Sequence, residues 1–152
     1  MHEILRVVID TNHIMSAILS DRGASLKLIN WMTKEDDYFT LLISEPIRRE
    51  YETVAGWLIP DIRRNERRRI LNILYDRAES VRPGIRINAC SDESDNRFIE
   101  CAIAGNADYL VTKNIRDFPP KEYQGVKIVR IGKFLTVLEH MEKTLKKLEP
   151  SG

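Results

Sequence analysis

The chain has 152 residues, of which 43% are hydrophobic and 31% are charged. This length fits one domain with one core, so we expect a single domain over residues 1–148 and a frayed tail over 149–152. The 24 basic and 23 acidic residues nearly cancel, so overall charge predicts neither a nucleic-acid partner nor an acidic one. No apolar run approaches the roughly 18 residues of a membrane helix, and no signal segment is recognisable, which predicts a cytoplasmic protein with no membrane partner.

The two cysteines, Cys90 and Cys101, lie eleven residues apart with no histidine nearby. This spacing fits neither a zinc site nor a disulfide framework. We therefore expect two buried free thiols.

The first predicted element is a buried strand that leads directly into an acid. Residues 5–9 are mostly apolar and β-branched, and Asp10, Thr11 and Asn12 follow them. Ligands of parallel α/β sheets bind at the carboxyl ends of the strands, which makes Asp10 a candidate catalytic residue. Apolar residues at helical spacing over 13–19 and 24–32 then predict two short helices or one broken helix.

A second strand is predicted over 38–43, and a helix is predicted to begin directly after it. Ser44 is a favourable N-cap, and Pro46 suits the first helical turn. The spacing of the apolar residues in this helix places Glu50 on its buried face. A buried carboxylate costs several kcal/mol unless it is paired or bound to metal. Glu50 is therefore either a metal ligand or the partner of an arginine.

A loop is predicted over 57–60 and a helix over 61–78, with Ile62, Ile70 and Leu74 on its core side. Arginines crowd the outer faces of this helix and the preceding one: Arg48, Arg49, Arg63, Arg64, Arg67, Arg68 and Arg69. Such a patch can follow the phosphates of a nucleic acid. A solvated helix face or a protein-binding surface explains it almost as well.

Residues 81–90 predict a turn and then a short strand or extended segment at 85–87. A cluster of acids, Asp92, Glu93 and Asp95, precedes the next helical stretch, which ends near residues 105–106. One acid is enough to cap a helix. The cluster of three therefore points to a further role.

A buried strand is predicted over 107–112, followed by a loop that contains Asn114 and Asp117. A last strand over 126–131 and an amphipathic helix over 132–148, with Leu148 among its inward residues, complete the pattern. The alternation of strands and helices predicts parallel pairing with right-handed crossovers, and hence a three-layer α/β/α sandwich.

Four acids are predicted to meet at the carboxyl edge of this sheet: Asp10, Glu50, Asp95 and Asp117. Carboxylates packed this closely repel one another unless a cation lies between them. Oxygen donors without histidine or cysteine select Mg²⁺ or Mn²⁺. Such a site supports metal-assisted hydrolysis of a phosphodiester. Neighbouring polar residues that we expect to orient water are Thr11, Asn12 and Thr112.

Four segments, in this order and at these separations, resemble the motifs of the PIN domain family: residues 7–12, 44–50, 91–102 and 107–118. They are similar in particular to the PIN-family ribonucleases, which include toxins of prokaryotic toxin–antitoxin pairs. The resemblance covers nearly the whole chain. It implies a mainly parallel sheet of four or five strands, metal-dependent cleavage of single-stranded RNA, and commonly a homodimer that an antitoxin inhibits.

The resemblance also implies roles for single residues. The three central acids of the family match Asp10, Glu50 and Asp95. Many members have an aspartate where this chain has Asn114, but some relatives show an Asn-x-x-Asp-Phe form. We therefore expect Asp117 as the fourth acid, Asn114 as a neutral ligand or water contact, and Asp92 as a reserve ligand. If neither Asp117 nor Asp92 reaches the site, one metal ion is expected instead of two.

The leading hypothesis is thus a Mg²⁺- or Mn²⁺-dependent endoribonuclease that acts as a toxin, with the arginine patch binding RNA. One alternative is a PIN-like domain that binds RNA or protein without cutting. Another is a Mg²⁺-dependent phosphatase of the haloacid dehalogenase type, which needs a second acid where this chain has Asn12. Trp31, Trp57 and the helix over 135–148 could serve an interface, but we expect them in the core.

Overall fold

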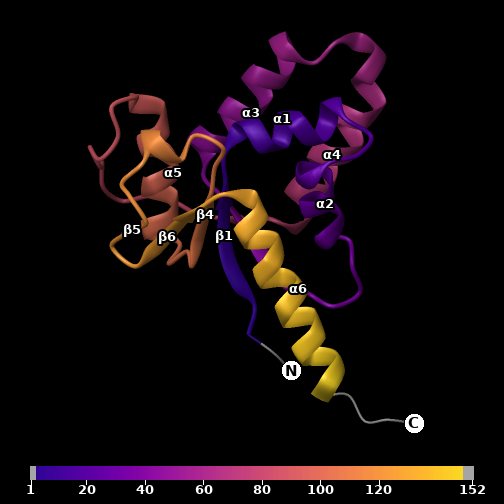
Figure 1. Ribbon diagram of the computed structural model, residues 1–152. Helices are drawn as coiled ribbons and strands as arrows, with labels where there is room; N and C mark the ends of the chain where they lie inside the picture. Colours follow the sequence, from indigo (N-terminus) through magenta and orange to yellow (C-terminus); the bar gives the residue numbers. More distant parts are fainter. Residues whose placement is uncertain (1–2, 149–152) are drawn as a thin grey trace.

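A six-stranded sheet lies at the centre of residues 3–148, which are the residues that the computed structural model describes (Figure 1). The strands are β1 (Leu5–Ile9), β2 (Phe39–Ile43), β3 (Glu79–Ser80), β4 (Tyr109–Val111), β5 (Glu122–Tyr123) and β6 (Val126–Val129). Their order across the sheet is β3-β2-β1-β4-β6-β5, and all neighbours pair in parallel except β5 with β6. The predicted mainly parallel sheet is confirmed, but it has six strands instead of four or five, because the short strands β3 and β5 extend its two edges.

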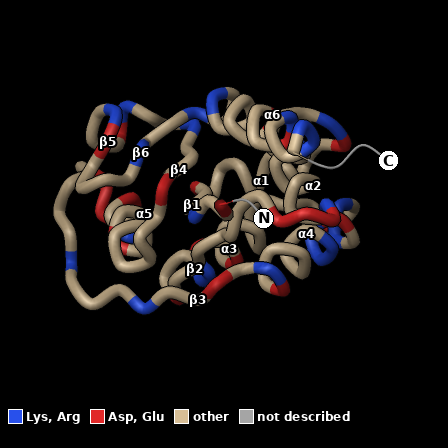
Figure 2. The backbone as a smooth tube through the Cα atoms, turned by 90° about the horizontal axis from the view of Figure 1, so that it is seen from below, with Lys and Arg blue, Asp and Glu red and all other residues tan. Residues whose placement is uncertain are grey.

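Helices cover both faces of the sheet: α1 (Thr11–Leu19), α2 (Ala24–Trp31), α3 (Glu45–Leu58), α4 (Arg64–Arg77), α5 (Glu93–Ala104) and α6 (Ile131–Leu148). Seen from below in Figure 2, α5 lies on one side of β1, β2 and β4, whereas α1, α2, α4 and α6 lie on the other. Helix α3 packs against both α1 and α5. The predicted three-layer α/β/α architecture is therefore confirmed.

The central strands are buried on both faces, as their apolar sequences require. Val7, Val8 and Ile9 of β1 have no exposed surface, and neither do Leu110 and Val111 of β4. Ile9 is in register with Val111. The residues that follow these two strands therefore emerge side by side at the carboxyl edge of the sheet.

The start of α3 follows the sequence prediction, but its end lies further along the chain. The Ser44 hydroxyl accepts a hydrogen bond of 3.4 Å from the Ile47 amide, and Pro46 lies in the first turn. The loop predicted from residue 57 is wrong by two residues, because the Ile59 amide still donates to the Ala55 carbonyl at 3.1 Å. Pro60, whose preceding residue is disfavoured in a helix, ends the segment.

Three apolar residues that the sequence placed in the core are exposed. Ile62 is 87% exposed because residues Asp61–Arg63 form a 3₁₀ turn, η1, and α4 begins only at Arg64. Trp57 is 71% exposed near the end of α3. Leu148 is 73% exposed because α6 runs beyond the edge of the sheet (Figure 1).

Two short strands differ from the sequence prediction. Of the two alternatives predicted for 85–87, a short strand or an extended segment, the strand is wrong: the described structure has none there, the chain pairs with β2 earlier, at Glu79–Ser80, and Ile85 is exposed. Strand β5 was not predicted. It forms a hairpin with β6 through Gln124 and Gly125, whose φ values of 47° and 90° are typical of a tight hairpin turn.

Cys90 and Cys101 are buried free thiols, as predicted. None of the helices within residues 3–148 combines the length and apolar character needed to cross a membrane. The tail predicted over 149–152 lies outside the described residues.

Candidate active site

Asp10 lies at the carboxyl edge of the sheet, between β1 and α1. It is 5% exposed. Its amide donates to the Val111 carbonyl at 3.0 Å, which continues the β1–β4 ladder by one residue. The hydroxyl of Thr112, the residue directly after β4, donates to Asp10 Oδ2 at 2.7 Å. The parallel register of β1 and β4 therefore fixes the position of the carboxylate.

Glu50 faces the same edge from α3 and is half-buried. Its carboxylate accepts a hydrogen bond from the Thr11 hydroxyl. Burial, and then the charges of Asp10 and Asp92, raise the pKa of Glu50. No lysine or arginine within residues 3–148 forms an ion pair with it. The alternative of a Glu50 salt bridge to arginine is therefore wrong.

Asp95 approaches from the first turn of α5 and is half-buried. Burial raises its pKa to about 7, and the charges of Asp10, Asp92, Asp117 and Glu50 act in the same direction. The Asp95 carboxyl therefore lies within electrostatic reach of these four. The acids that the sequence placed at one edge are near enough for their charges to act on one another.

Asp92 caps the N-terminus of α5. Its Oδ1 accepts hydrogen bonds from the amide and the hydroxyl of Ser94, at 2.9 and 2.8 Å. These bonds lower the pKa of Asp92, which is exposed. Its charge nevertheless acts on Glu50 and Asp95. Asp92 thus serves as the helix cap in this structure, with its reserve-ligand role still a prediction.

The loop after β4 presents Asp117 to the cluster. Residues Ile115–Asp117 form a 3₁₀ turn, η2, which the Asp117 amide closes by donating to the Asn114 carbonyl at 2.9 Å. The Asp117 charge raises the pKa of both Asp10 and Asp95. Asn114 donates its amide to the Thr112 hydroxyl at 3.0 Å. This arrangement favours Asp117 as the fourth acid. Asn12 lies exposed in the first turn of α1.

Two buried polar residues that support the site were not singled out from the sequence. Asn96 is fully buried, and its Oδ1 accepts hydrogen bonds from the amides of Ala89 and Cys90, at 3.0 and 2.8 Å. The Tyr51 hydroxyl donates to the Ile9 carbonyl at 2.5 Å and ties α3 to the end of β1. In both cases the sequence signal is a polar side chain at a position that the helical spacing of the apolar residues places on the buried face.

The arginines predicted to bind RNA divide into paired and unpaired groups. Arg63 is anchored, because its guanidinium donates to the Ile18 carbonyl at 3.0 and 2.8 Å and pairs with Asp21 at 3.0 Å. Arg48 and Arg49 share the exposed carboxylate of Glu45, at 3.2 and 3.3 Å.

The remaining arginines of this group lie on α4. Arg67 lies 3.9 Å from Glu52. Arg64 and Arg68 have no ion pair within residues 3–148. These three arginines and Glu52 line a cavity of about 330 Å³. None of the clustered acids lines this cavity, so the arginine surface and the acid site are distinct features.

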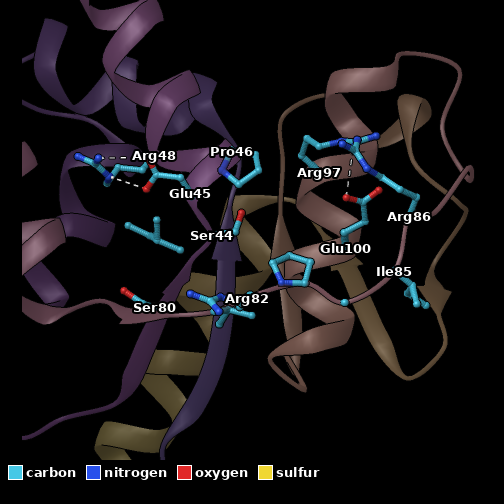
Figure 3. A pocket seen from close by; sticks show the side chains of 14 residues that line it. Ser44, Glu45, Pro46, Arg48, Ser80, Arg82, Ile85, Arg86, Arg97 and Glu100 are labelled. Carbon is cyan, nitrogen blue, oxygen red and sulfur yellow. Dashed lines mark hydrogen bonds and ion pairs between the residues drawn. The ribbon is translucent and has the colours of Figure 1, made fainter.

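A larger cavity, of about 700 Å³, opens between α3, the segment after β3 and α5 (Figure 3). Arg48 and Glu45 lie on one side of it, and on the other side Arg97 lies 3.3 Å from the buried carboxylate of Glu100. Helix α3 carries Arg48 at the cavity and Glu50 at the acid cluster. Helix α5 likewise carries Arg97 at the cavity and Asp95 at the acid cluster, and none of the clustered acids lines the cavity itself.

The donor set of the site fits a hard divalent cation. Its charged groups are carboxylates, and burial raises the pKa of the nearby Cys90 thiol to about 11, so this thiol is uncharged at neutral pH in the metal-free protein. Within residues 3–148, no three acidic, histidine or cysteine side chains already stand in metal-binding geometry. Mg²⁺ retains several waters and needs only one or two carboxylates. The cluster therefore suits a hydrated ion more than a closed protein cage.

Comparisons with known proteins agree with this architecture. An uncharacterised protein of Methanocaldococcus jannaschii is 31% identical over 108 residues, which cover 68% of this chain and 67% of the relative. The structure of VapBC2 from Rickettsia felis, bound to a DNA fragment from their promoter, contains a chain of the same fold. The TM-score is 0.55 at 18% identity, and the match covers 83% of this chain and 98% of that one.

The family model of the PIN domain matches residues 6–116, a span that holds Asp10, Glu50 and Asp95. PIN domains are typically nucleases, and PIN nucleases generally use divalent metal ions. With a matching family model, a parallel sheet and acids gathered at its carboxyl edge, the chain belongs to the PIN domain family.

Proposed function

We propose that this protein is a Mg²⁺- or Mn²⁺-dependent endoribonuclease that hydrolyses phosphodiester bonds of single-stranded RNA. One observation carries the proposal. Carboxylates from four separate elements converge at the carboxyl edge of the sheet, and burial and mutual repulsion raise the pKa values of Asp10, Glu50 and Asp95. Such a concentration of negative charge is stabilised by a cation.

In this proposal Asp10, Glu50, Asp95 and Asp117 hold the metal. A divalent ion there would activate water, orient the scissile phosphate and offset charge on the leaving oxygen. Hydroxyl groups of the protein set the orientation of two of the ligands, since Thr112 donates to Asp10 and Thr11 donates to Glu50. Asn12 and Asn114 are proposed to contact water or substrate at the rim of the site.

The substrate strand is proposed to follow basic groups on both sides of the acids. The cavity of Figure 3 offers Arg82 and Arg86, whose side chains have no hydrogen bond or ion pair within residues 3–148. Arg48 and Arg49 are held only by an exposed ion pair, which is worth about 0–1 kcal/mol and which a phosphate can displace. Arg64, Arg67 and Arg68 extend this surface, whereas Arg63 is assigned a structural role through Ile18.

We further propose that the protein acts in the cytoplasm as the toxin of a toxin–antitoxin pair and forms a homodimer. The support is the family resemblance and the VapBC2 structure of the same fold. Trp57 and Ile62, with Leu58 beside them, give the corner between α3 and α4 exposed apolar surface that a protein partner could cover. Size-exclusion chromatography of the protein alone and after coexpression with its neighbouring reading frame tests both assemblies.

A second candidate function is a PIN domain that binds RNA or protein without cutting. It is favoured by the lack, among the described side chains, of a preformed group of three metal ligands. Thermal unfolding with Mn²⁺ separates the two functions. A catalytic site gains stability as the ion binds the folded state, whereas a non-catalytic scaffold gains none.

The substrate and metal requirements are tested by incubating the purified protein with labelled single-stranded RNA, double-stranded RNA and single-stranded DNA. Each substrate is offered with Mg²⁺, Mn²⁺ or EDTA. Cutting of single-stranded RNA alone, with either metal and without EDTA, is the expected result. Cutting that persists in EDTA, or an equal rate on all three substrates, contradicts the proposal.

A further inference from the structure

A third cavity, of about 720 Å³, lies between α1, the start of α2 and the start of α6. We propose that it binds a phosphate group of the RNA strand, at a position beside the scissile bond. This inference rests on the proposed nuclease function. The cavity would hold a phosphate that the acid site cannot hold, because carboxylates repel a phosphate wherever no metal ion lies between them.

The cavity is lined by four basic residues and by no acid: Arg22, Lys113, Arg130 and Lys133. The side chains of Arg22, Arg130 and Lys133 make no hydrogen bond or ion pair within residues 3–148, and Lys113 Nζ donates only to the Ser16 hydroxyl, at 2.5 Å. The cavity of Figure 3, by contrast, has two glutamates among its arginines. This third cavity therefore has a stronger preference for an anion than the cavity of Figure 3.

Two helices begin at the cavity, and neither carries an acid in its first turn. Helix α2 starts after Gly23, which offers no side-chain cap, and α6 starts at Ile131. The first amide groups of a helix lack intrahelical partners and carry partial positive charge. Two such ends beside unpaired cations form a setting that favours phosphate oxygens.

A buried histidine in the wall of the cavity has one ring nitrogen without a partner among the described residues. His13 is 1% exposed, and its Nδ1 lies 3.0 Å from the Ser25 hydroxyl. Its Nε2 is buried without a hydrogen bond within the described residues. In the tautomer in which Nδ1 accepts a hydrogen bond from the Ser25 hydroxyl, Nε2–H is left to donate to a ligand oxygen.

The cavity adjoins the acid site along the edge of the sheet. Thr112 lines the cavity and also donates to Asp10. Arg130 directly follows β6, and the strand order here is β1-β4-β6. Because neighbouring strands lie about 4.8 Å apart, the two sites are separated by about two strand spacings, or roughly 10 Å. One RNA strand can therefore reach both.

The test uses the full-length double variant Arg130→Gln/Lys133→Gln, which removes two exposed charges at the cavity. The matched control is Lys143→Gln/Lys147→Gln, which removes two exposed charges at the other end of α6. Fluorescence anisotropy in EDTA measures binding of a 12-nucleotide single-stranded RNA without cleavage. We expect the Kd of the cavity variant to rise about tenfold and its log–log salt slope to flatten by about 0.7, the amount expected for the loss of one phosphate contact to a single strand. A Kd within twofold of the control variant overturns the proposal.

Two further arms identify the source of the phosphate. RNAs with a 5′-hydroxyl and a 5′-phosphate are compared: equal loss of affinity for both indicates an internal phosphate, and loss for the phosphorylated strand alone indicates a terminal one. Inorganic phosphate at constant ionic strength should raise the Tm of the wild-type protein but not that of the cavity variant.

The outcomes separate this inference from the proposed function. Cleavage that depends on Asp10, together with unchanged RNA affinity in the cavity variant, overturns the phosphate site and leaves the nuclease intact. Wild-type protein that neither binds nor cuts RNA overturns the nuclease and the RNA role of the cavity together, even where inorganic phosphate stabilises it.

Discussion

The Thr112 hydroxyl donates a hydrogen bond of 2.7 Å to Asp10 Oδ2 and so joins two residues that lie 102 positions apart in the sequence. Both residues directly follow buried parallel strands, β1 and β4, whose register brings Ile9 opposite Val111. The same hydroxyl accepts the Asn114 amide at 3.0 Å. One threonine thus orients the first acid of the site and the start of the loop that carries Asp117.

Replacing Thr112 with valine keeps the shape of the side chain but removes this donor. We expect Mn²⁺ affinity to fall about tenfold, since losing a group that orients a metal ligand typically costs 10–100-fold. The free energy of unfolding should fall by about 1 kcal/mol. Metal titration and urea unfolding measure both effects. Thr112→Ser, which keeps the hydroxyl, is the control, and equal behaviour of the two variants would show that the hydrogen bond has no role in metal binding.

Mn²⁺ should stabilise the folded protein through the acid cluster. At a concentration 100 times its Kd, the ion adds about 2.7 kcal/mol to the free energy of unfolding. Glu50→Gln should lose most of this gain, because it removes one charged ligand from the cluster. Glu45→Gln, which alters an exposed glutamate five residues earlier on α3, should keep it. The gain is measured by thermal unfolding, and a similar gain in both variants would place the ion elsewhere.

Stability of the metal-free protein should fall as the pH rises from about 4 to 7. The pKa of Asp95 is raised to about 7 in the folded state, so the folded protein keeps a proton that the unfolded chain has already lost. Asp95→Asn should remove much of this decline. After a discount for solvent screening, we expect Asp95→Asn to raise the free energy of unfolding at pH 8 by about 1–2 kcal/mol, which corresponds to about 3–6 °C in Tm.

Thermal unfolding in EDTA at pH 5 and pH 8 measures this decline. Glu45→Gln is again the control, because its arginine partners lower the pKa of Glu45 and it does not titrate in this range. A wild-type Tm that is the same at both pH values would show that the folded state does not raise the pKa of Asp95.

Asn96 should be essential for placing α5. Its Oδ1 accepts the amides of Ala89 and Cys90, so Asn96→Ala leaves two buried donors without partners. With each unpaired group costing about 1–3 kcal/mol, we expect a loss of about 3 kcal/mol, measured by urea unfolding. Asn88→Ala, at an exposed position nearby, should change stability by less than about 0.5 kcal/mol. A loss below 1 kcal/mol at Asn96 would mean that water replaces the side chain.

The sequence was sufficient to predict features that depend on local patterns. Buried strands, the Ser44 cap and the acids after β1 and β4 follow from apolar runs and from the residues that end them. The gathering of Asp10 and Asp117 also follows, since the carboxyl ends of parallel strands share one edge.

Features that depend on packing between distant segments were not predicted. The exposure of Ile62 depends on a 3₁₀ turn that delays the start of α4. The support given by Asn96 depends on a loop folding back on α5. The third cavity joins residues of α1 and α2 to the start of α6, and no local pattern in the sequence connects His13 with Lys133.

Cleavage of a labelled single-stranded RNA by the Asp10→Asn variant, measured beside the wild-type protein, is the most direct test of the proposed active site. The variant keeps the size of the side chain and removes one charge from the cluster, so we expect it to fold. With Mn²⁺ present, the wild type should cut the RNA, and the variant should show no cleavage above the level in EDTA. Equal cleavage by the two proteins would contradict the central claim that the acids at the carboxyl edge of the sheet form the active site.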